Sequence, residues 1–159
     1  MPETPEERQR RLSIEIGQRA QLFKKLVDEF GPRVLEITQQ NLIEEVRAWI
    51  ESLPLPQRNL PAMLHILWNQ VGTDLDYTIE EQTPEHMKMC VTRCMWADEF
   101  RKRDAGDIGY SFYCASDYGY CQGLNPKIKF SRTKTLMQGD DCCDHTYDLP
   151  AADSVSSGD

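Results

Sequence analysis

The first half of the chain repeats apolar residues at steps of three and four positions, the spacing of an amphipathic helix. One such stripe over residues 12–30 predicts a helix that ends at Gly31-Pro32. A second stripe over residues 35–53 predicts another helix, which Pro54 stops. The short segment 60–71 is apolar on most sides and predicts a third helix. We expect these apolar faces to form core.

The pattern then changes from helical spacing to alternation. Segments 76–83 and 87–94 alternate apolar and polar residues on either side of a turn, as a β-hairpin would. Segment 95–104 returns to helical character. Segment 107–122 is also predicted to be helical, although its glycines weaken helix formation by about 1 kcal/mol each.

Alternation returns near the end of the chain and predicts a second hairpin. Its strands are expected at 126–136 and 142–149, joined by a turn at 138–141. The predicted fold class is α+β, with N-terminal helices packed on a small antiparallel sheet of two hairpins separated by helices. We expect one domain over 1–150, with a helical part (1–71) and a cysteine-rich sheet part (72–150), followed by a disordered polar tail (151–159).

Charge and length exclude several classes of partner. The 159 residues include 18 Lys and Arg against 26 Asp and Glu, and no stretch has the clustered basic residues that a phosphate backbone requires. Nucleic acid is therefore an unexpected partner. The N-terminus is charged, and apolar stretches elsewhere are only a few residues long, so we expect neither export nor membrane insertion. The sequence predicts a cytoplasmic protein, and it does not indicate an oligomeric state.

All six cysteines lie in the last 70 residues of the chain, and none occurs before them. Without a secretion signal they are expected to be thiols in a reducing compartment. A single cysteine is often only a small buried hydrophobic residue, but this concentration indicates a chemical role. The cysteines are Cys90, Cys94, Cys114, Cys121, Cys142 and Cys143.

The densest group of reactive side chains is the segment 139–145, which contains two thiols, three carboxylates and an imidazole. Alternation along the predicted strand sorts them by face, because successive side chains point to opposite sides. Only one of the two neighbouring thiols can therefore face a given pocket. The two sets of residues that share a face are Cys143, His145 and Tyr147, and Cys142, Asp144 and Thr146.

A catalytic thiol needs a partner that favours its thiolate form. His145 is the nearest imidazole to Cys143, but two residues along a strand separate Cβ atoms by roughly 6–7 Å, beyond a direct hydrogen bond. His86 is an alternative partner. Cys114 and Asp117 stand three apart, on one face of a helix, and could supply a thiol and a carboxylate. Ordinary helix packing is the alternative explanation of that pair.

A metal site is a second possibility for the thiols, because four or more Cys and His side chains could converge on zinc or an iron–sulfur cluster. The spacing argues against it, since the sequence contains no Cys-x-x-Cys pair and Cys142 and Cys143 would face opposite ways. We therefore expect no cofactor. The alternative to an enzyme is a thiol-rich module that binds a metal or ligand, or acts as a sensor, without turnover.

The segment from Cys90 to Tyr147 resembles the L-2-amino-thiazoline-4-carboxylic acid hydrolase family. In that family a strand ending in Cys precedes helices, a Cys-x-x-Asp, an Arg-containing strand and a Gly-Asp-x-x-Cys turn. The corresponding residues here are Cys94, Cys114-Ala115-Ser116-Asp117, Arg132-Thr133-Lys134-Thr135-Leu136 and Gly139-Asp140-Asp141-Cys142-Cys143.

The resemblance implies a small-molecule substrate and hydrolytic opening of a cyclic isothiourea at its amidine-like carbon. Its register selects Cys143 rather than Cys142 as the thiol that attacks this carbon. Asp117 would be a base or an orienting group, and Arg132 would pair with the substrate carboxylate. The remaining candidates are His145 and Cys114 as catalytic residues, and Thr135 and Cys94 as substrate-binding residues.

Overall fold

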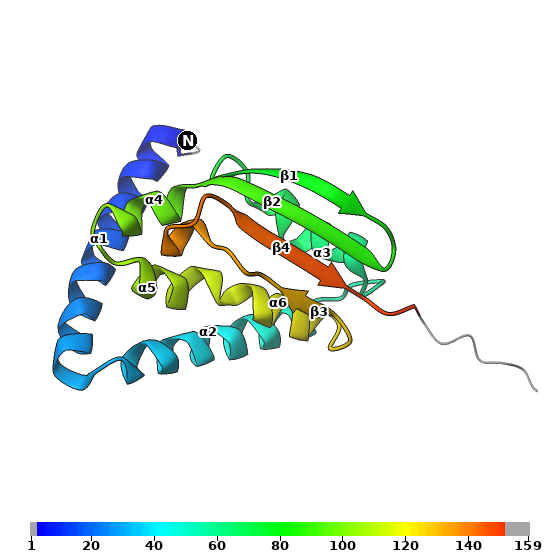
Figure 1. Cartoon of the computed structure of the whole chain (residues 1–159), viewed down its shortest axis with the longest axis horizontal. Coiled ribbons are helices and arrows are strands. Elements are labelled where there is room, and N and C mark those ends of the chain that lie inside the picture. The colour runs from blue at the N-terminus through cyan, green and yellow to red at the C-terminus, as the bar shows by residue number, and fades with distance from the viewer. Residues whose placement is uncertain (1–2, 152–159) are drawn as a thin grey trace, which may run out of the picture.

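The computed structural model describes residues 3–151 and confirms the α+β class, with helices packed on an antiparallel sheet of two hairpins separated by helices (Figure 1). Most of the predicted tail, residues 152–159, lies outside the described residues. The helices are α1 (Pro5–Phe30), α2 (Arg33–Ser52), α3 (Leu60–Ile66), α4 (Met95–Arg101), α5 (Gly106–Gly109) and α6 (Ser116–Leu124). The strands are β1 (Leu75–Gln82), β2 (His86–Cys94), β3 (Lys129–Ser131) and β4 (Cys143–Asp148). Short 3-10 turns lie at Trp68–Gln70 and Leu136–Gln138, and a π-helical turn lies at Tyr110–Cys114.

Local signals in the sequence account for both ends of α1. The Thr4 hydroxyl accepts a hydrogen bond from the backbone N–H of Glu7, and the Glu7 carboxylate accepts one from the backbone N–H of Thr4. This reciprocal capping box satisfies donors that the first turn leaves open. Gly31 ends the helix with a φ of 80°, a conformation that favours glycine. The predicted break between the first two helices therefore falls at Gly31-Pro32.

The sheet has the strand order β1-β2-β4-β3, with every neighbouring pair antiparallel. The central pair β2 and β4 places Val91 opposite Cys143 and Met89 opposite His145. Burial along β4 alternates in the way that the sequence predicts, because Cys143, His145 and Tyr147 are buried while the residues between them are only partly covered. Cys143 is therefore on the covered face with His145 and Tyr147, whereas Cys142, which directly precedes β4, is only half-buried.

The first strand of the second hairpin is shorter than predicted. We expected a strand over 126–136, but β3 contains only Lys129–Ser131. The chain leaves the sheet because the Asp144 side chain takes the backbone N–H groups of Thr133 and Lys134, at 2.8 and 2.6 Å. These donors are then unable to continue a ladder with β4.

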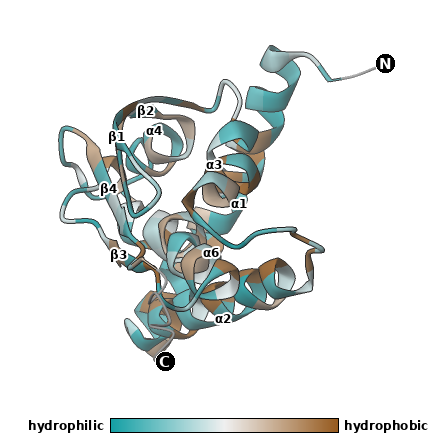
Figure 2. Cartoon of the chain, turned by 90° about the vertical axis from the view of Figure 1, so that its right-hand side faces the viewer, coloured by the Kyte–Doolittle hydropathy of each residue, from teal (hydrophilic) through white to brown (hydrophobic). Residues whose placement is uncertain are grey.

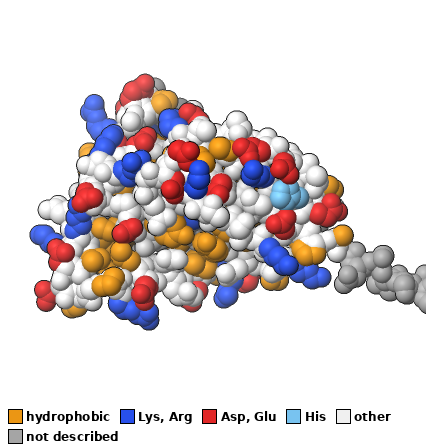
Figure 3. Space-filling model, viewed as in Figure 1, with side chains coloured by type: hydrophobic (Ala, Val, Ile, Leu, Met, Phe, Trp, Pro, Cys, Tyr) orange, Lys and Arg blue, Asp and Glu red, His pale blue; other side chains and the backbone are white. Residues whose placement is uncertain are grey.

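The helices cover one face of the sheet and leave the other face to solvent. Figure 2 shows the sheet on one side of the molecule and α1, α2, α3 and α6 on the other. The covered face contributes the buried side chains of Met87, Met89 and Val91 to a core with residues of α2, α3 and α6. On the opposite face, Figure 3 shows acidic and basic side chains interspersed over the strands.

Two glycines that weakened the helix prediction allow α6 to pack closely on α2. A Cβ at Gly119 would lie 2.7 Å from the backbone oxygen of Ile43, and one at Gly123 would lie 2.6 Å from that of Arg47. Any larger residue would push the helices apart. The helical prediction for 107–122 is confirmed, with the difference that the π-helical turn Tyr110–Cys114 interrupts α-helical geometry.

Candidate active site

A cavity of about 370 Å³ lies where β2, β4 and the segment from the π-helical turn to α6 meet. Its volume falls in the range of small-molecule sites. Six of the seven predicted site residues line it, namely Cys94, Cys114, Asp117, Arg132, Cys143 and His145. A larger and more open depression of about 540 Å³, bordered by α1, α4 and α5, contains none of these residues. The chemistry of the smaller cavity makes it the candidate site.

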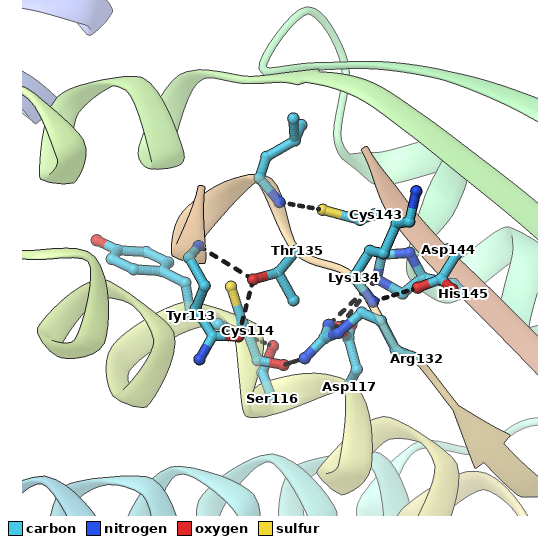
Figure 4. Close-up of polar contacts among 12 residues, drawn as sticks. Tyr113, Cys114, Ser116, Asp117, Arg132, Lys134, Thr135, Cys143, Asp144 and His145 are labelled. Carbon is cyan, nitrogen blue, oxygen red and sulfur yellow. Dashed lines mark hydrogen bonds and ion pairs between the residues drawn. The ribbon is translucent and has the colours of Figure 1, made fainter. Parts of the chain in front are cut away.

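Two of the three thiols that face the cavity accept backbone hydrogen bonds. Cys143 Sγ accepts one from the N–H of Leu136 at 3.2 Å, and Cys94 Sγ accepts one from the N–H of Ala97 at 3.4 Å (Figure 4 shows the Cys143 contact). Burial raises the pKa of Cys94 to about 11 and raises that of Cys114 further. Burial also raises the pKa of Cys143, although the Leu136 N–H and Arg132 oppose it. All three groups are therefore thiols at neutral pH in the absence of substrate.

A buried cluster of charged and polar groups borders the thiols. Asp117 Oδ2 accepts a hydrogen bond from Arg132 Nη1 and lies 3.2 Å from His145 Nε2 (Figure 4). Burial alone would raise the pKa of Asp117, but His145 and Arg132 outweigh it and hold this pKa below its ordinary value. Asp117 is therefore a carboxylate at neutral pH. Both contacts use Oδ2, so among the described residues Oδ1 is left without a partner.

The π-helical turn orients this cluster. The N–H of Ala115 donates to the oxygen of Tyr110, five residues earlier. The carbonyl oxygen of Cys114 accepts a hydrogen bond from Arg132 Nη2 at 3.1 Å. π-helical geometry occurs mostly as single turns inside α-helices, and these turns are frequent at functional sites. Here it brings the Cys114 carbonyl and the Asp117 carboxylate to the same guanidinium.

His145 belongs to this cluster rather than to the Cys143 thiol. Its Nε2 faces Asp117, and in residues 3–151 no hydrogen bond joins its ring to Cys143. Its ring packs edge-on against Trp68 at a centroid distance of 5.0 Å. The buried Nδ1 atom has no hydrogen-bond partner within the described chain.

Thr135 does not line the cavity with the other predicted site residues. Its hydroxyl accepts from the N–H of Gln138 at 3.1 Å and begins the 3-10 turn that contains Leu136. His86, the alternative imidazole, lies at the far end of β2, where it contacts Asp148 at 2.7 Å. Thr135 therefore acts on the site only through the turn that it caps.

The remaining cysteines lie away from the cavity. Cys121 is buried in the core between α6 and the sheet. Cys90 and Cys142 are half-buried, and neither lines the cavity. Within residues 3–151, no group of three or more His, Cys, Asp and Glu side chains is arranged to hold a metal ion. The zinc or iron–sulfur alternative therefore gains no support from the described residues.

Reasoning from the sequence missed several residues of the cavity wall. Trp68, Trp96 and Tyr113 supply its aromatic surface, and Arg8 and Asp74 form an ion pair that also lines it. Arg8 and Asp74 are 66 residues apart, so no local spacing connects them. The only sequence signal for Trp96 was its position just after the strand that ends at Cys94.

The fold and the cavity define a small α+β protein with a thiol- and carboxylate-lined site of small-molecule size. The model of the L-2-amino-thiazoline-4-carboxylic acid hydrolase family matches residues 10–147, and the chain belongs to that family. The match extends the resemblance from the cysteine-rich half to most of the helical half. The family name implies a hydrolase that acts on a small molecule. A search of curated proteins found no match to this chain. None of the described helices is both long and apolar enough to span a membrane.

Proposed function

We propose that this protein hydrolyses a small cyclic isothiourea, of the 2-aminothiazoline-4-carboxylate type, at the cavity lined by Cys143. The observation that carries the proposal is the convergence of the Cys143 thiol, the Asp117 carboxylate and the Arg132 guanidinium on one 370 Å³ cavity. A thiol can attack an amidine-like carbon, and a carboxylate can hold the amidinium that makes this carbon electrophilic.

Asp117 is suited to bind the substrate amidinium. Its lowered pKa keeps it ionised, so it can accept N–H hydrogen bonds but cannot act as an acid. Oδ2 is held by Arg132 and His145, which leaves Oδ1 for the exocyclic or ring nitrogen of the substrate. Arg132 and His145 thus fix the carboxylate before substrate arrives, and this preorganisation lowers the cost of binding the cation.

In the proposed reaction, Cys143 Sγ forms a bond to the amidine carbon and the ring C–N bond breaks. The thiol proton passes to the ring nitrogen as it leaves, so the ring opens to an amine while the carbon stays attached to Cys143. One water then adds to this carbon and the Cys143–carbon bond breaks. The product is a carbamoyl-cysteine, and the net change is the addition of one water.

The other predicted residues have supporting parts in this proposal. His145 holds Asp117 and can relay a proton, since its Nδ1 makes no hydrogen bond to any described residue. Cys114, whose pKa is strongly raised, stays a thiol and can donate to the substrate. Cys94 forms part of the wall. Thr135 is a positioning residue, because the turn it caps carries the Leu136 N–H that contacts Cys143.

The pairing of Arg132 with the substrate carboxylate stays a prediction from the sequence. It requires donors that face the cavity, whereas Nη1 and Nη2 of Arg132 are directed to Asp117 and to the Cys114 oxygen. The side chain is only 2% exposed. These contacts support a different role, in which Arg132 supplies positive charge beside Asp117 and Cys143.

The proposal is tested by incubating the purified protein with L-2-aminothiazoline-4-carboxylate and measuring the carbamoyl-cysteine product by mass spectrometry. Intact-mass analysis of a rapidly quenched reaction should show one added substrate, and peptide mapping should place it on Cys143. Elemental analysis of the same protein distinguishes the alternative. Stoichiometric zinc or iron without turnover would contradict the hydrolase and favour a metal-binding module.

A further inference from the structure

Arg8 lines the cavity, and only part of its guanidinium group forms hydrogen bonds. Arg8 lies in the first turns of α1, beside α4 and the start of the sheet (Figure 1). Its Nε and Nη2 donate to the two carboxylate oxygens of Asp74, and both residues line the same cavity as Cys143. The side chain of Asp74 is 8% exposed, whereas that of Arg8 is 42% exposed. The carboxylate of this ion pair is therefore buried, and its guanidinium is partly exposed to solvent.

A guanidinium can form two parallel pairs of hydrogen bonds, one on its Nε–Nη2 edge and one on its Nη1–Nη2 edge. Asp74 occupies the first edge of Arg8. Within residues 3–151, Nη1 makes no hydrogen bond, so the second edge is open. Arg132 differs, because its Nη1 and Nη2 are both occupied and its side chain is buried. Of the two guanidinium groups that line the cavity, Arg8 has the open edge.

We propose that Arg8 binds the carboxylate of the substrate through its Nη1–Nη2 edge and so selects rings that carry a carboxylate over rings that lack it. The inference rests on the proposed function and assigns the two ends of the substrate. The amidinium lies at Asp117 in the interior, and the carboxylate lies at Arg8 near the mouth. Asp74 is a positioning residue, because its bidentate contact fixes the plane of the guanidinium before substrate binds.

Arg8 lies just outside the segment that the family model matches. The matched segment begins at residue 10, two positions after Arg8. The ion pair with Asp74 joins the start of α1 to the turn that leads into β1. Specificity for the carboxylate would then depend on the N-terminal turns of α1 being docked against this turn.

The test measures binding by titration calorimetry in the Cys143→Ser protein, with two probes that differ only in the carboxylate. The probes are L-2-aminothiazoline-4-carboxylate and 2-amino-2-thiazoline. Arg8→Gln should weaken binding of the carboxylated ring by about 10- to 100-fold, as expected for a hydrogen-bonded charge pair. Binding of 2-amino-2-thiazoline, which lacks the carboxylate, should change by less than about twofold. Arg10→Gln is the matched control, because Arg10 is exposed on the same helix, and it should change neither.

A second variant separates binding from stability, because Arg8→Gln leaves the buried Asp74 without its partner. Asp74→Asn removes the competing charge but keeps Arg8, so it should lose much less affinity for the carboxylated ring than Arg8→Gln. Melting temperatures of all variants serve as folding controls. Equal losses in Arg8→Gln and Asp74→Asn, or equal losses for both probes, would overturn the role of Arg8. If the protein with Arg8 intact bound neither ring, the proposed function itself would fail.

Discussion

Cys142 and Cys143 are neighbours in the chain and occupy opposite environments. Cys143 is buried at 7% exposure, faces the cavity and accepts a hydrogen bond from Leu136. Cys142 is half-buried and lies outside the cavity, where burial and Asp141 raise its pKa to about 11. Cys143 is the first residue of β4 and shares its covered face, whereas Cys142 directly precedes the strand. Position in the chain, rather than residue type, decides which thiol lines the cavity.

The same contrast holds for two carboxylates. Asp117 on the inner side pairs with Arg132 and His145, whereas Asp144 on the outer side accepts from the backbone N–H groups of Thr133 and Lys134. Both have a pKa below the ordinary value, against the opposing effect of burial. One carboxylate holds a charged cluster at the cavity, and the other shapes a loop. A lowered pKa alone therefore does not identify a functional carboxylate.

The largest effect should come from the inner thiol. Cys143→Ser should reduce turnover by about a thousandfold or more, because a serine hydroxyl is a much weaker acid and a weaker nucleophile than a thiol. Cys142→Ser should stay within about threefold of the unmodified protein, since its side chain points away from the cavity. Turnover with circular dichroism as the folding control measures both. Equal losses would mean that the two faces do not differ in chemistry, and full activity in Cys143→Ser would remove this nucleophile.

A large effect on stability should come from the inner ion pair. Arg132→Met leaves the buried Asp117 charge without its cation, which costs about 3–5 kcal/mol and lowers the melting temperature by about 10 °C. Arg93→Gln is the outer control, because Arg93 and Asp76 form an exposed pair on the sheet. Its loss should cost less than about 1 kcal/mol. Similar melting temperatures for the two variants would show that the inner cluster adds no special stability.

Acid should weaken the inner cluster before it changes the rest of the fold. Asp117 has a lowered pKa when folded, so its contribution is complete above the ordinary pKa of an aspartate and is lost as pH falls below that value. Between pH 5 and pH 3, the free energy of unfolding should therefore fall less steeply in Asp117→Asn than in the unmodified protein. The two slopes should differ by up to about 1.4 kcal/mol per pH unit. Urea denaturation at several pH values measures the slope. A slope unchanged by Asp117→Asn would mean that the pKa of Asp117 is not lowered by folding.

The smallest predicted effect on turnover concerns two threonines in the loop before β4. Thr135→Ala removes the cap of the turn that carries Leu136 and should cost about 1 kcal/mol with a severalfold fall in kcat. Thr133→Ala removes a hydroxyl that donates to Asp144 on the outer side. It should change stability by a similar amount and leave kcat unaltered. Parallel kinetics on the two variants test whether Thr135 positions the amide next to Cys143, and equal kcat values would argue against it.

Repeating patterns made much of the fold predictable. Helical spacing placed α1 and α2, and alternation placed β2 and β4 with the correct faces, because burial imposes a period on each element. The strand predicted over 126–136 was too long, because the Asp144 side chain takes the backbone donors of Thr133 and Lys134 and β3 ends before them. Alternation in the sequence contains no sign of that competition. A pattern predicts a strand, and a single side chain can end it.

The candidate site was predictable only in part. The clustering of cysteines indicated the half of the chain that supplies three thiols to the cavity, and strand alternation placed Cys143 and His145 on one face. No local pattern indicated the pairing of Asp117 with Arg132, since 15 residues and a change of element separate them. Arg8 and Asp74 were missed for the same reason, at a separation of 66 residues. Contacts between distant elements arise only when the helices dock on the sheet.

The π-helical turn Tyr110–Cys114 makes the site sensitive to chain length. It holds one residue more than an α-helical turn would need. The helices on either side are fixed, because a Cβ at Gly109 would collide with Met137 and Phe100, and α6 lies against α2 through Gly119. A one-residue deletion could not be absorbed by rotating either helix, so it would displace the cavity-facing residues that follow the turn. In this stretch, we expect substitutions to be tolerated better than insertions or deletions of one residue.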